Sequence, residues 1–341
     1  MKRKQSGFKI MMRLIKLVKP LAGFMLLAIL LGVTGFLCAI QITTLGSMTL
    51  LTAAGINGGI AIKTGCICII VFAVLRGFLH YGEQACNHYI AFKLLALIRD
   101  KVFKSLRRLA PAKLEGKDKG NLISLITSDI ELLEVFYAHT ISPVCIAFLT
   151  SLIMLAFIGR YSLWLALVAF AAYVTVGVVI PLLSSKFNKN IGMTYRENSG
   201  ALSGYVLDSM RGLLESIRYN ATNVRLDNMN QKTDELNSLQ KRLKKIEGHN
   251  VSITDVAIIF FSISMLLVGI YLYQNGTIGF DGLIVSTVAM MSSFGPVAAL
   301  SNLAGNLTHT LASGERVLSI LDEIPVVEEN TNGDDIIFEA M

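Results

Sequence analysis

The sequence predicts an all-α membrane protein with six transmembrane helices, several of which extend well beyond the bilayer. Of its 341 residues, 53% are hydrophobic and 16% are charged, whereas a soluble domain is about 45–50% apolar and about 25% charged. The apolar residues form six long blocks, and the lysines and arginines lie almost entirely between alternate blocks. This composition excludes a disordered chain, a secreted disulfide scaffold and an ordinary cytosolic enzyme.

Six windows are long and apolar enough to cross a bilayer, which takes about 20 mainly apolar residues. They are residues 21–44, 59–81, 135–158, 163–183, 253–273 and 282–305. The first window is longer than the apolar core of a signal peptide, which has about 7–15 residues. It also has no clear small-residue cleavage site before further apolar sequence. We therefore expect the first window to be a retained helix.

The lysines and arginines predict the orientation of these helices. Residues 1–20 contain seven of them, residues 84–134 contain nine and residues 184–252 contain eleven, so that these segments hold 27 of the 31 in the chain. The other connections, near residues 52–58, 159–162 and 274–281, contain a single lysine or arginine, Arg160. The positive-inside rule then places both termini and both long connections in the cytoplasm. We expect a multi-pass protein of the inner (plasma) membrane.

The two long connections have the apolar spacing of helices. In the first, apolar residues recur at helical intervals between positions 90 and 106, and Pro111 ends the pattern. We expect one helix from about residue 60 to 108, roughly 70 Å long, of which only ~30 Å lies in hydrocarbon. The second connection is also helical and polar, and the helices should therefore project far into the cytoplasm.

Residues 1–20 predict a separate amphipathic helix. Lys9, Arg13 and Lys16 fall on one side of this helix, and the other side carries Phe8, Met11, Met12, Ile15 and Val18. Pro20 breaks the run. A basic amphipathic helix of this kind lies in the membrane interface, and the alternative is that it simply extends the first span.

Polar residues inside spans usually face a cavity or one another. Two sets recur at helical spacing near the predicted cytoplasmic ends of the second and sixth spans: Arg76, His80, Glu83 and Asn87, and Asn302, Asn306 and His309. One hypothesis is that both sets line a transport pathway and contact an anionic or polar substrate. The alternative is a partnership between Arg76 and Glu83 that only fixes helix packing.

The sequence shows no catalytic or metal-binding constellation. Spacing indicates no Ser/His/Asp or paired-carboxylate arrangement, and Cys66 and Cys68 lie about 200° apart on a helix, which is poor geometry for joint ligation. We interpret the five cysteines as small reduced hydrophobic residues. The basic segments lack interleaved aromatic residues, which argues against a nucleic-acid partner.

Several short motifs resemble the transmembrane half of a type I ABC exporter. They are the run Gly120 to Ser124 followed by Asp129 and Ile130, the run Met210 to Gly212 followed by Ile217 and Arg218, Pro296 in the sixth span, and the run Arg316 to Pro325. The helix before the first span resembles the elbow helix of that family. The resemblance covers essentially the whole chain, and it rests on the order and spacing of these motifs on six spans. The segment from Met12 to Pro20 further resembles the C-subunit branch of the heterodimeric thiol and heme-related exporters required for cytochrome bd assembly.

The resemblance implies a type I ABC exporter fold with three parts: an elbow segment (1–20), a six-helix transmembrane domain (21–323), and a linker with the start of a nucleotide-binding domain (324–341). It also implies two coupling helices, near residues 111–117 and 220–226, that dock on nucleotide-binding domains. The residues expected to carry coupling are Pro111, Leu114, Gly120, Asp129, Gly212, Asn220 and Arg225.

The sequence contains no G-x-x-x-x-G-K-[ST] phosphate-binding loop. We therefore expect this chain to bind no cofactor and to have no ATPase activity by itself, with ATP and magnesium bound by a nucleotide-binding domain that is truncated, lost or separately encoded. The expected partners are the lipid bilayer, a second transmembrane half, nucleotide-binding domains and a substrate that the sequence does not identify.

The resemblance favours the transmembrane subunit of an ATP-driven exporter that works as a homodimer or heterodimer. Two alternatives stay open at this point. One is an inactive remnant of such a transporter, which would share every residue described above. The other is a six-span membrane enzyme or sensor, which would place acidic or histidine clusters deep in the bundle.

Overall fold

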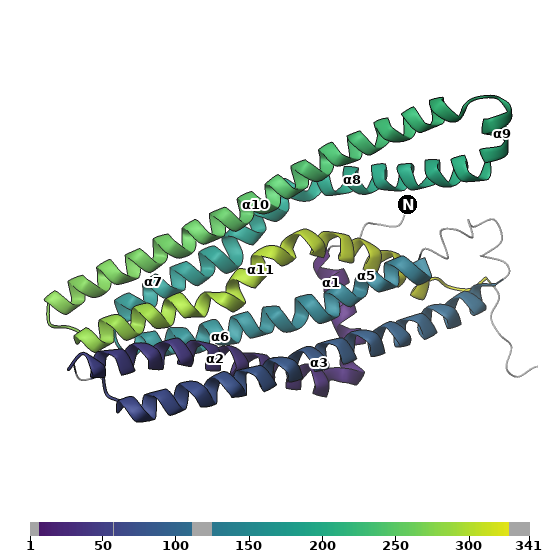
Figure 1. Cartoon of the computed structure of the whole chain (residues 1–341). Helices are drawn as coiled ribbons and strands as arrows, with labels where there is room; N and C mark the ends of the chain where they lie inside the picture. The colour runs from purple at the N-terminus through teal and green to yellow at the C-terminus, as the bar shows by residue number, and fades with distance from the viewer. Residues whose placement is uncertain (1–6, 57, 111–124, 327–341) are drawn as a thin grey trace, which may run out of the picture. The chain divides into compact units, whose positions relative to one another are not determined.

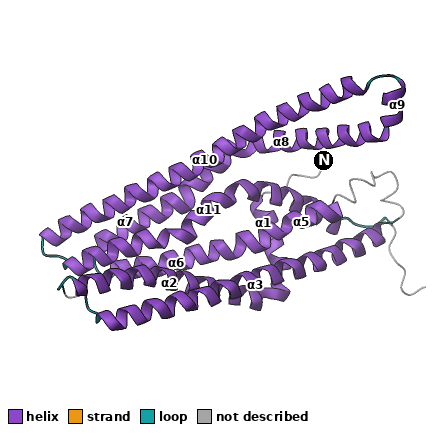
Figure 2. Cartoon of the chain, viewed as in Figure 1, coloured by secondary structure: helices purple, strands orange, loops and turns teal. Residues whose placement is uncertain are grey.

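A computed structural model of the chain describes residues 7–56, 58–110 and 125–326, and for some helical residues, among them 301–309, it describes the backbone alone. All regular structure in these residues is helical (Figure 2). The α-helices are α1 (Gly7–Leu17), α2 (Ala22–Ala53), α3 (Ile62–Leu109), α5 (Ile130–Phe136), α6 (Ser142–Gly159), α7 (Leu163–Val174), α8 (Ile180–Arg211), α9 (Leu213–Arg218), α10 (Thr222–Gln274) and α11 (Phe280–Leu321).

Short segments of other helical types join some of these α-helices. A single 3-10 turn at Lys19–Leu21 leads into α2. The π-helical segments are Leu125–Asp129, Tyr137–Ile141 and Thr175–Val179. They make Leu125–Gly159 one continuous helical run and connect α7 directly to α8.

Six helical runs of the described chain are long and apolar enough to cross a membrane. They are Lys19–Ala53, Ile62–Leu109, Leu125–Gly159, Leu163–Ser184, Thr222–Gln274 and Phe280–Leu300. Each overlaps one of the six predicted windows, and four of them contain the window completely, which confirms the all-α, six-span architecture. Because lipid offers no hydrogen-bond partner to a peptide group, a continuous helix is the form in which an isolated apolar segment crosses the bilayer.

Two helices continue far beyond the hydrocarbon, as their apolar spacing predicts. Helix α3 contains 48 residues and is about 72 Å long. Helix α10 contains 53 residues and is about 80 Å long. The predicted end of α3 is confirmed, because the helix stops at Leu109, two residues before Pro111.

The N-terminal segment forms a helix of its own, α1, so it does not extend the first span. Of the predicted apolar side, Val18 is buried, whereas Met12 and Ile15 are exposed. Ile10 and Leu14, which that side did not include, are also buried. Helix α1 carries apolar residues around most of its circumference, so packing within the chain covers one part of them, and the location of the helix in the membrane interface stays a prediction.

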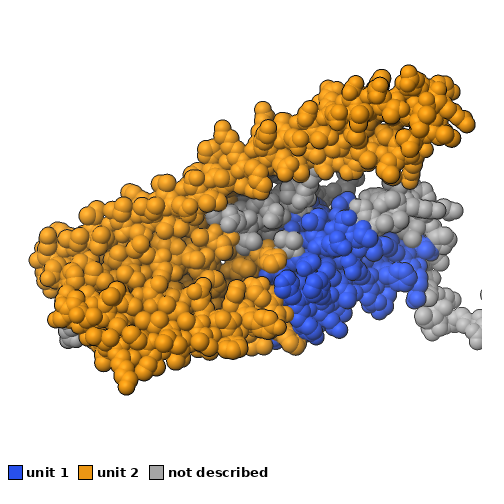
Figure 3. All heavy atoms as spheres, in the orientation of Figure 1, with its two compact units in different colours: residues 1–23, 88–138, 309–341 blue, residues 24–87, 139–308 orange. Residues whose placement is uncertain are grey.

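The described chain forms two compact units, coloured separately in Figure 3. The smaller unit comprises residues 1–23, 88–138 and 309–341, and the larger unit comprises residues 24–87 and 139–308. The core of the larger unit is formed by α7, α10 and α11 with residues of α2 and α6. Its fully buried side chains include Leu165, Ala172, Val176, Met265 and Met290.

Within the larger unit, α8 and α10 form a long hairpin whose tip is α9 (Figure 1). The resemblance implied a coupling helix near residues 220–226. The structure instead places the short helix at Leu213–Arg218, and residues 222–226 form the first turns of α10. The shift arises because Asn220 adopts a φ of 49°, which ends one helix and allows the next to start.

Helices α2 and α3 approach each other closely at small residues, as is usual for helices in membranes. At Gly35 an added Cβ would lie 3.6 Å from Cβ of Leu79. At Gly65 an added Cβ would lie 3.2 Å from Cβ of Thr49 and closer still to its hydroxyl. The Thr49 hydroxyl is itself held by a 2.7 Å bond to the Leu45 carbonyl, so that it cannot move aside easily.

Replacing Gly65 with alanine should therefore destabilise the chain by about 1–3 kcal/mol, the typical cost of overpacking. Gly77 lies on the same helix with nothing within 4 Å of an added Cβ. Gly77→Ala should thus be neutral or stabilising by up to about 1 kcal/mol, through helix propensity. Thermal unfolding of both variants in detergent measures the difference, and equal melting temperatures would contradict the close contact.

Candidate functional site

Side chains of α8 and α10 hold the tip of the hairpin in one geometry. The Arg225 guanidinium donates to Oγ of Ser209 at 3.1 Å and lies 5.9 Å from the ring centre of Tyr205. The Tyr205 hydroxyl donates to the Arg225 carbonyl at 3.4 Å, and Lys232 lies 5.6 Å from the same ring. Arg225, a predicted coupling residue, thus connects the two helices of the hairpin just behind the tip.

The tip carries an exposed apolar surface, which we call the tip surface. Tyr219 is 82% exposed, Met210 is 70% exposed and Ile217 is 60% exposed. The other large apolar residues of this surface are Leu213, Leu214, Val224 and Leu226. Exposed apolar patches of this kind on a protein surface mark sites of interaction.

The predicted coupling residues Gly212 and Asn220 bracket α9. The amide of Gly212 donates to the Asp208 carbonyl at 2.9 Å, which closes α8. Asn220 is the one non-glycine residue with positive φ in the described part of the chain, and asparagine tolerates this conformation better than most residues. The two positions therefore set where α9 begins and ends.

In the smaller unit, the carboxylate of Asp129 joins α11 to the π-helical segment Leu125–Asp129. Asp129 is 1% exposed. Its Oδ1 accepts hydrogen bonds from Oγ of Ser313 at 3.0 Å and from the Arg316 guanidinium. The ion pair connects Asp129 and Arg316, two residues from motifs that lie almost 190 positions apart in the sequence. A buried carboxylate requires such a cation.

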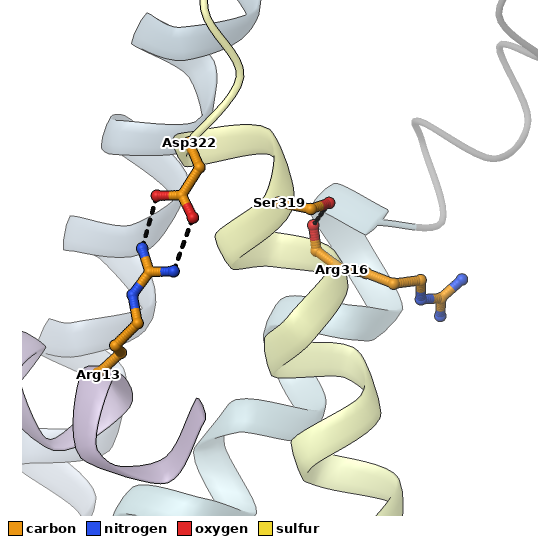
Figure 4. Close-up of polar contacts among 4 residues, drawn as sticks. All are labelled: Arg13, Arg316, Ser319 and Asp322. Atoms are coloured by element: carbon orange, nitrogen blue, oxygen red, sulfur yellow. Dashed lines mark hydrogen bonds and ion pairs between the residues drawn. The ribbon is translucent and has the colours of Figure 1, made fainter. Parts of the chain in front are cut away.

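A second ion pair in the smaller unit ties α1 to the end of α11 (Figure 4). The Arg13 guanidinium donates to both oxygens of Asp322, at 2.6 and 2.5 Å. This two-bond geometry fixes orientation as well as distance. The hydrogen bond to Asp322 raises the pKa of the Arg13 guanidinium above its already high ordinary value, so that the guanidinium stays charged throughout the physiological pH range.

Buried contacts attach α1 to the same unit. The Tyr137 hydroxyl donates to the Leu14 carbonyl at 3.1 Å. Leu14 is fully buried, and its side chain lies against Gly314 of α11, where an added Cβ would be 2.8 Å from a Leu14 methyl. Together with Arg13, these contacts make α1 a packed part of the unit.

The predicted polar face of α3 is partly assembled. Glu83 is 5% exposed and Asn87 is 3% exposed. Glu83 Oε2 lies 3.1 Å from Nδ1 of His80, and the Asn87 amide donates to Glu83 Oε1 at 3.3 Å. In the described part of the chain, Arg76 is not among the partners of Glu83, which is bound instead by residues one turn away. The proposed packing pair of Arg76 and Glu83 was therefore wrong.

Several predicted site residues lie outside what the structure describes. Pro111, Leu114 and Gly120 fall in the segment that is not described, and the side chains of Asn302, Asn306 and His309 belong to α11 residues whose backbone alone is described. Among the described residues, no three His, Cys, Asp or Glu side chains are arranged to hold a metal ion. The five cysteines, all of them in the described residues, form no disulfide with one another.

Sequence reasoning missed the pairing of Arg13 with Asp322 and the tip surface. The pair joins residues 309 positions apart, and no local pattern indicates such a contact. The tip surface did leave a signal, because Met210, Leu213, Leu214 and Ile217 recur at the spacing of one helix face. These apolar residues lie in the connection 184–252, outside every predicted span.

The Arg13–Asp322 pair predicts a charge-reversal rescue. Arg13→Glu places two carboxylates together and should loosen α1, whereas Arg13→Glu with Asp322→Arg should restore its attachment. Since the pair is partly exposed, with 29% and 43% of the side chains accessible, its coupling energy should be at most about 1 kcal/mol and should fall with added salt. Hydrogen exchange of the α1 amides reports the loosening, and a double variant as labile as Arg13→Glu would contradict the pair.

Removing the cation of the buried pair should cost more. Arg316→Ala leaves the Asp129 carboxylate buried without a charged partner, which should destabilise the chain by about 1–3 kcal/mol. Arg316→Lys retains the charge and should lose less, and Asp129→Asn with Arg316→Ala should recover part of the loss. Thermal unfolding checks the order of the three variants. If Arg316→Ala were the mildest, the carboxylate would not depend on Arg316.

Comparison with known proteins agrees with this architecture. Residues 21–297 match the ABC transporter transmembrane region. A probable ABC transporter ATP-binding/permease protein of Haemophilus influenzae is 46% identical over 96% of this chain and 59% of its own length. The glutathione/L-cysteine transport system ATP-binding/permease protein CydC of the same organism is 21% identical over 76% of this chain and 45% of its own length.

A further relative is ATP-dependent lipid A-core flippase 1 of Colwellia psychrerythraea, which is 23% identical over 94% of this chain and 53% of its own length. The chain therefore spans about half the length of the curated relatives it matches. The six apolar helices, the long hairpin and the match over residues 21–297 lead to one conclusion: the chain belongs to the family of ABC transporter transmembrane regions.

Proposed function

We propose that this chain is the membrane half of an ATP-driven exporter and that its tip surface docks on a nucleotide-binding domain. The observation that carries the proposal is the position of the tip surface. The start of α10 at Thr222 is 31 residues from the start of the apolar window at residue 253, about 46 Å along the helix axis. Lipid does not reach apolar residues so far from the hydrocarbon layer, so the partner that can bury them is another protein surface.

The rigid hairpin supports a coupling role. Helix α10 runs without a break from the tip into its span, so that a force at α9 is transmitted along one helix. The bonds of Arg225 to Tyr205 and Ser209 hold the start of α10 against α8. The relatives named as ATP-binding/permease proteins are about twice as long as the region that this chain matches, which supports a nucleotide-binding domain, with its ATP and magnesium, as the partner.

The exposed face of α3 supports pairing with a second transmembrane half. Only 6% of the apolar window of α3 is buried within the chain, against 56% for the window of α11. Arg76 and His80 lie on exposed parts of α3. A charged side chain in a span avoids lipid and faces protein or water, and we infer that this face is turned toward the pathway or the second half.

The same proposal fixes the orientation. The hairpin and both termini lie on the cytoplasmic side of the inner membrane, where ATP is available, and the positively charged connections agree with that side. The substrate is exported from that side. The names of the relatives, a glutathione/L-cysteine transport system and a lipid A-core flippase, supply the first substrates to test. Inside-out vesicles that contain the complete transporter should accumulate one of these substrates in the presence of ATP.

A charge placed on the tip surface should disrupt docking. Ile217→Glu should weaken binding of the separately purified nucleotide-binding domain by tenfold or more, because burial of the apolar side chain is lost and a charge must be desolvated. Gln240→Glu adds the same charge at an exposed position in the body of the hairpin and should leave binding unchanged. Titration of the domain onto the chain in nanodiscs measures both affinities.

An Ile217→Glu variant that binds as well as the unmodified chain would contradict docking at the tip surface. Equal weakening by both variants would show that the effect is one of net charge on the hairpin and would likewise contradict it.

A further inference from the structure

Buried hydroxyl groups in the spans of this chain usually donate to the carbonyl of the preceding helical turn. Thr44 donates to Ile40 at 2.8 Å, and Thr49 donates to Leu45 at 2.7 Å. On α11, Ser286 donates to Gly282 at 2.6 Å. This bond is the simplest way to satisfy a hydroxyl that has no water around it.

Three buried polar atoms of the larger unit depart from this pattern. Oδ1 of Asn87, Oγ of Ser142 and Oγ1 of Thr150 have no hydrogen-bond partner within the part of the chain that the structure describes. The three residues are 3%, 0% and 1% exposed, respectively. Each such atom costs about 1–3 kcal/mol if it stays unsatisfied, and a bound water or ion is a usual partner of such an atom in a native protein.

Asn87 and Ser142 each lie one helical turn from a residue that contacts Gly32. Glu83 on α3 and Ile146 on α6 both lie against Gly32 of α2, where an added Cβ would be 3.3 Å from the Glu83 carboxyl carbon. Asn87 is one turn beyond Glu83, and Ser142 is one turn before Ile146. Because consecutive spans cross in opposite directions, these two turns lie toward the same side of the membrane.

Thr150 does not share this place. It lies eight residues from Ser142 on α6, about 12 Å along the helix axis, on the far side of Ile146. The candidate site therefore consists of the Glu83 carboxylate, the Asn87 amide oxygen and the Ser142 hydroxyl.

The charge around Glu83 is unbalanced. Helices α2 and α6, which meet at Gly32, contain no charged residue, and their titratable groups are the thiols of Cys38 and Cys145. On α3 itself, the nearest titratable group is His80, whose side chain is 63% exposed. A carboxylate that is only 5% exposed and whose partners in the described residues are a histidine and an amide calls for a positive charge beside it.

We propose that Glu83, Asn87 and Ser142 form a binding site for one monovalent cation. One carboxylate with two neutral oxygens balances a single positive charge, whereas calcium draws several carboxylates. Transition metals prefer nitrogen and sulfur ligands, and the described residues hold no cluster of three His, Cys, Asp or Glu. The chemistry is one positive charge surrounded by oxygens, supplied by an alkali metal ion or by a primary ammonium group.

The site does not depend on docking at the tip surface, so that either proposal can fail alone. Its test is the thermal unfolding of the full chain in nanodiscs at constant pH and ionic strength. The bulky N-methylglucamine chloride is replaced stepwise by sodium, potassium or methylammonium chloride. A ligand that binds only the folded state lowers the unfolding equilibrium constant about 11-fold at ten times its dissociation constant, and the stabilisation should follow a binding curve for at least one cation.

Variants locate the effect. Glu83→Gln keeps the shape of the side chain and should abolish the cation dependence, and Ser142→Ala should weaken it about tenfold. Ser286→Ala removes a buried hydroxyl that is already bonded within its own helix and should retain the dependence of the unmodified chain. Selectivity for sodium or potassium identifies a metal-ion site, and selectivity for methylammonium identifies an ammonium site.

Three results would overturn the proposal. The first is an unfolding temperature that no cation changes, which would leave His80 or a proton as the partner of Glu83. The second is the same shift with all three salts, which would be a general salt effect. The third is an unchanged response in both Glu83→Gln and Ser142→Ala.

Discussion

The constraint on which this structure depends is the absence of water in the hydrocarbon layer. Each peptide group there must be bonded within the chain, so that every crossing is a helix. Once a helix has begun, continuing it into water costs little, and α3 and α10 exceed the ~30 Å of hydrocarbon by more than twofold. The length by which α10 continues from its span to α9 is therefore a direct extension of the feature that lets it cross the membrane.

That constraint also decides which parts were predictable from the sequence. Spans, the end of α3 before Pro111 and the separate helix α1 follow from local composition and periodicity, and all were predicted. The Arg13–Asp322 pair and the Asp129–Arg316 pair depend on packing between segments about 309 and 187 residues apart, and periodicity has no information on such distances. The position of α9 was missed because it depends on one backbone angle, the positive φ of Asn220.

The two most buried acids of the described chain differ in how their charge is balanced. Asp129 lies in the smaller unit and has a guanidinium and a hydroxyl on one oxygen, so that its charge is balanced by a residue that is always protonated. Glu83 lies in the larger unit among apolar helices, with a partly exposed histidine and an amide. The first arrangement is permanent and suits a structural joint, whereas the second can change with what binds to it.

The contacts of the smaller unit connect α1 mechanically to the end of α11. Arg13 binds the last turn of α11, and Leu14 lies against Gly314 of the same helix. Any displacement of the end of α11 must therefore either carry α1 with it or break a charged pair and expose a buried leucine. The pair contributes at most about 1 kcal/mol and the buried leucine about 1.5–3 kcal/mol, so that α1 follows small movements of α11 as one body and separates only under a larger force.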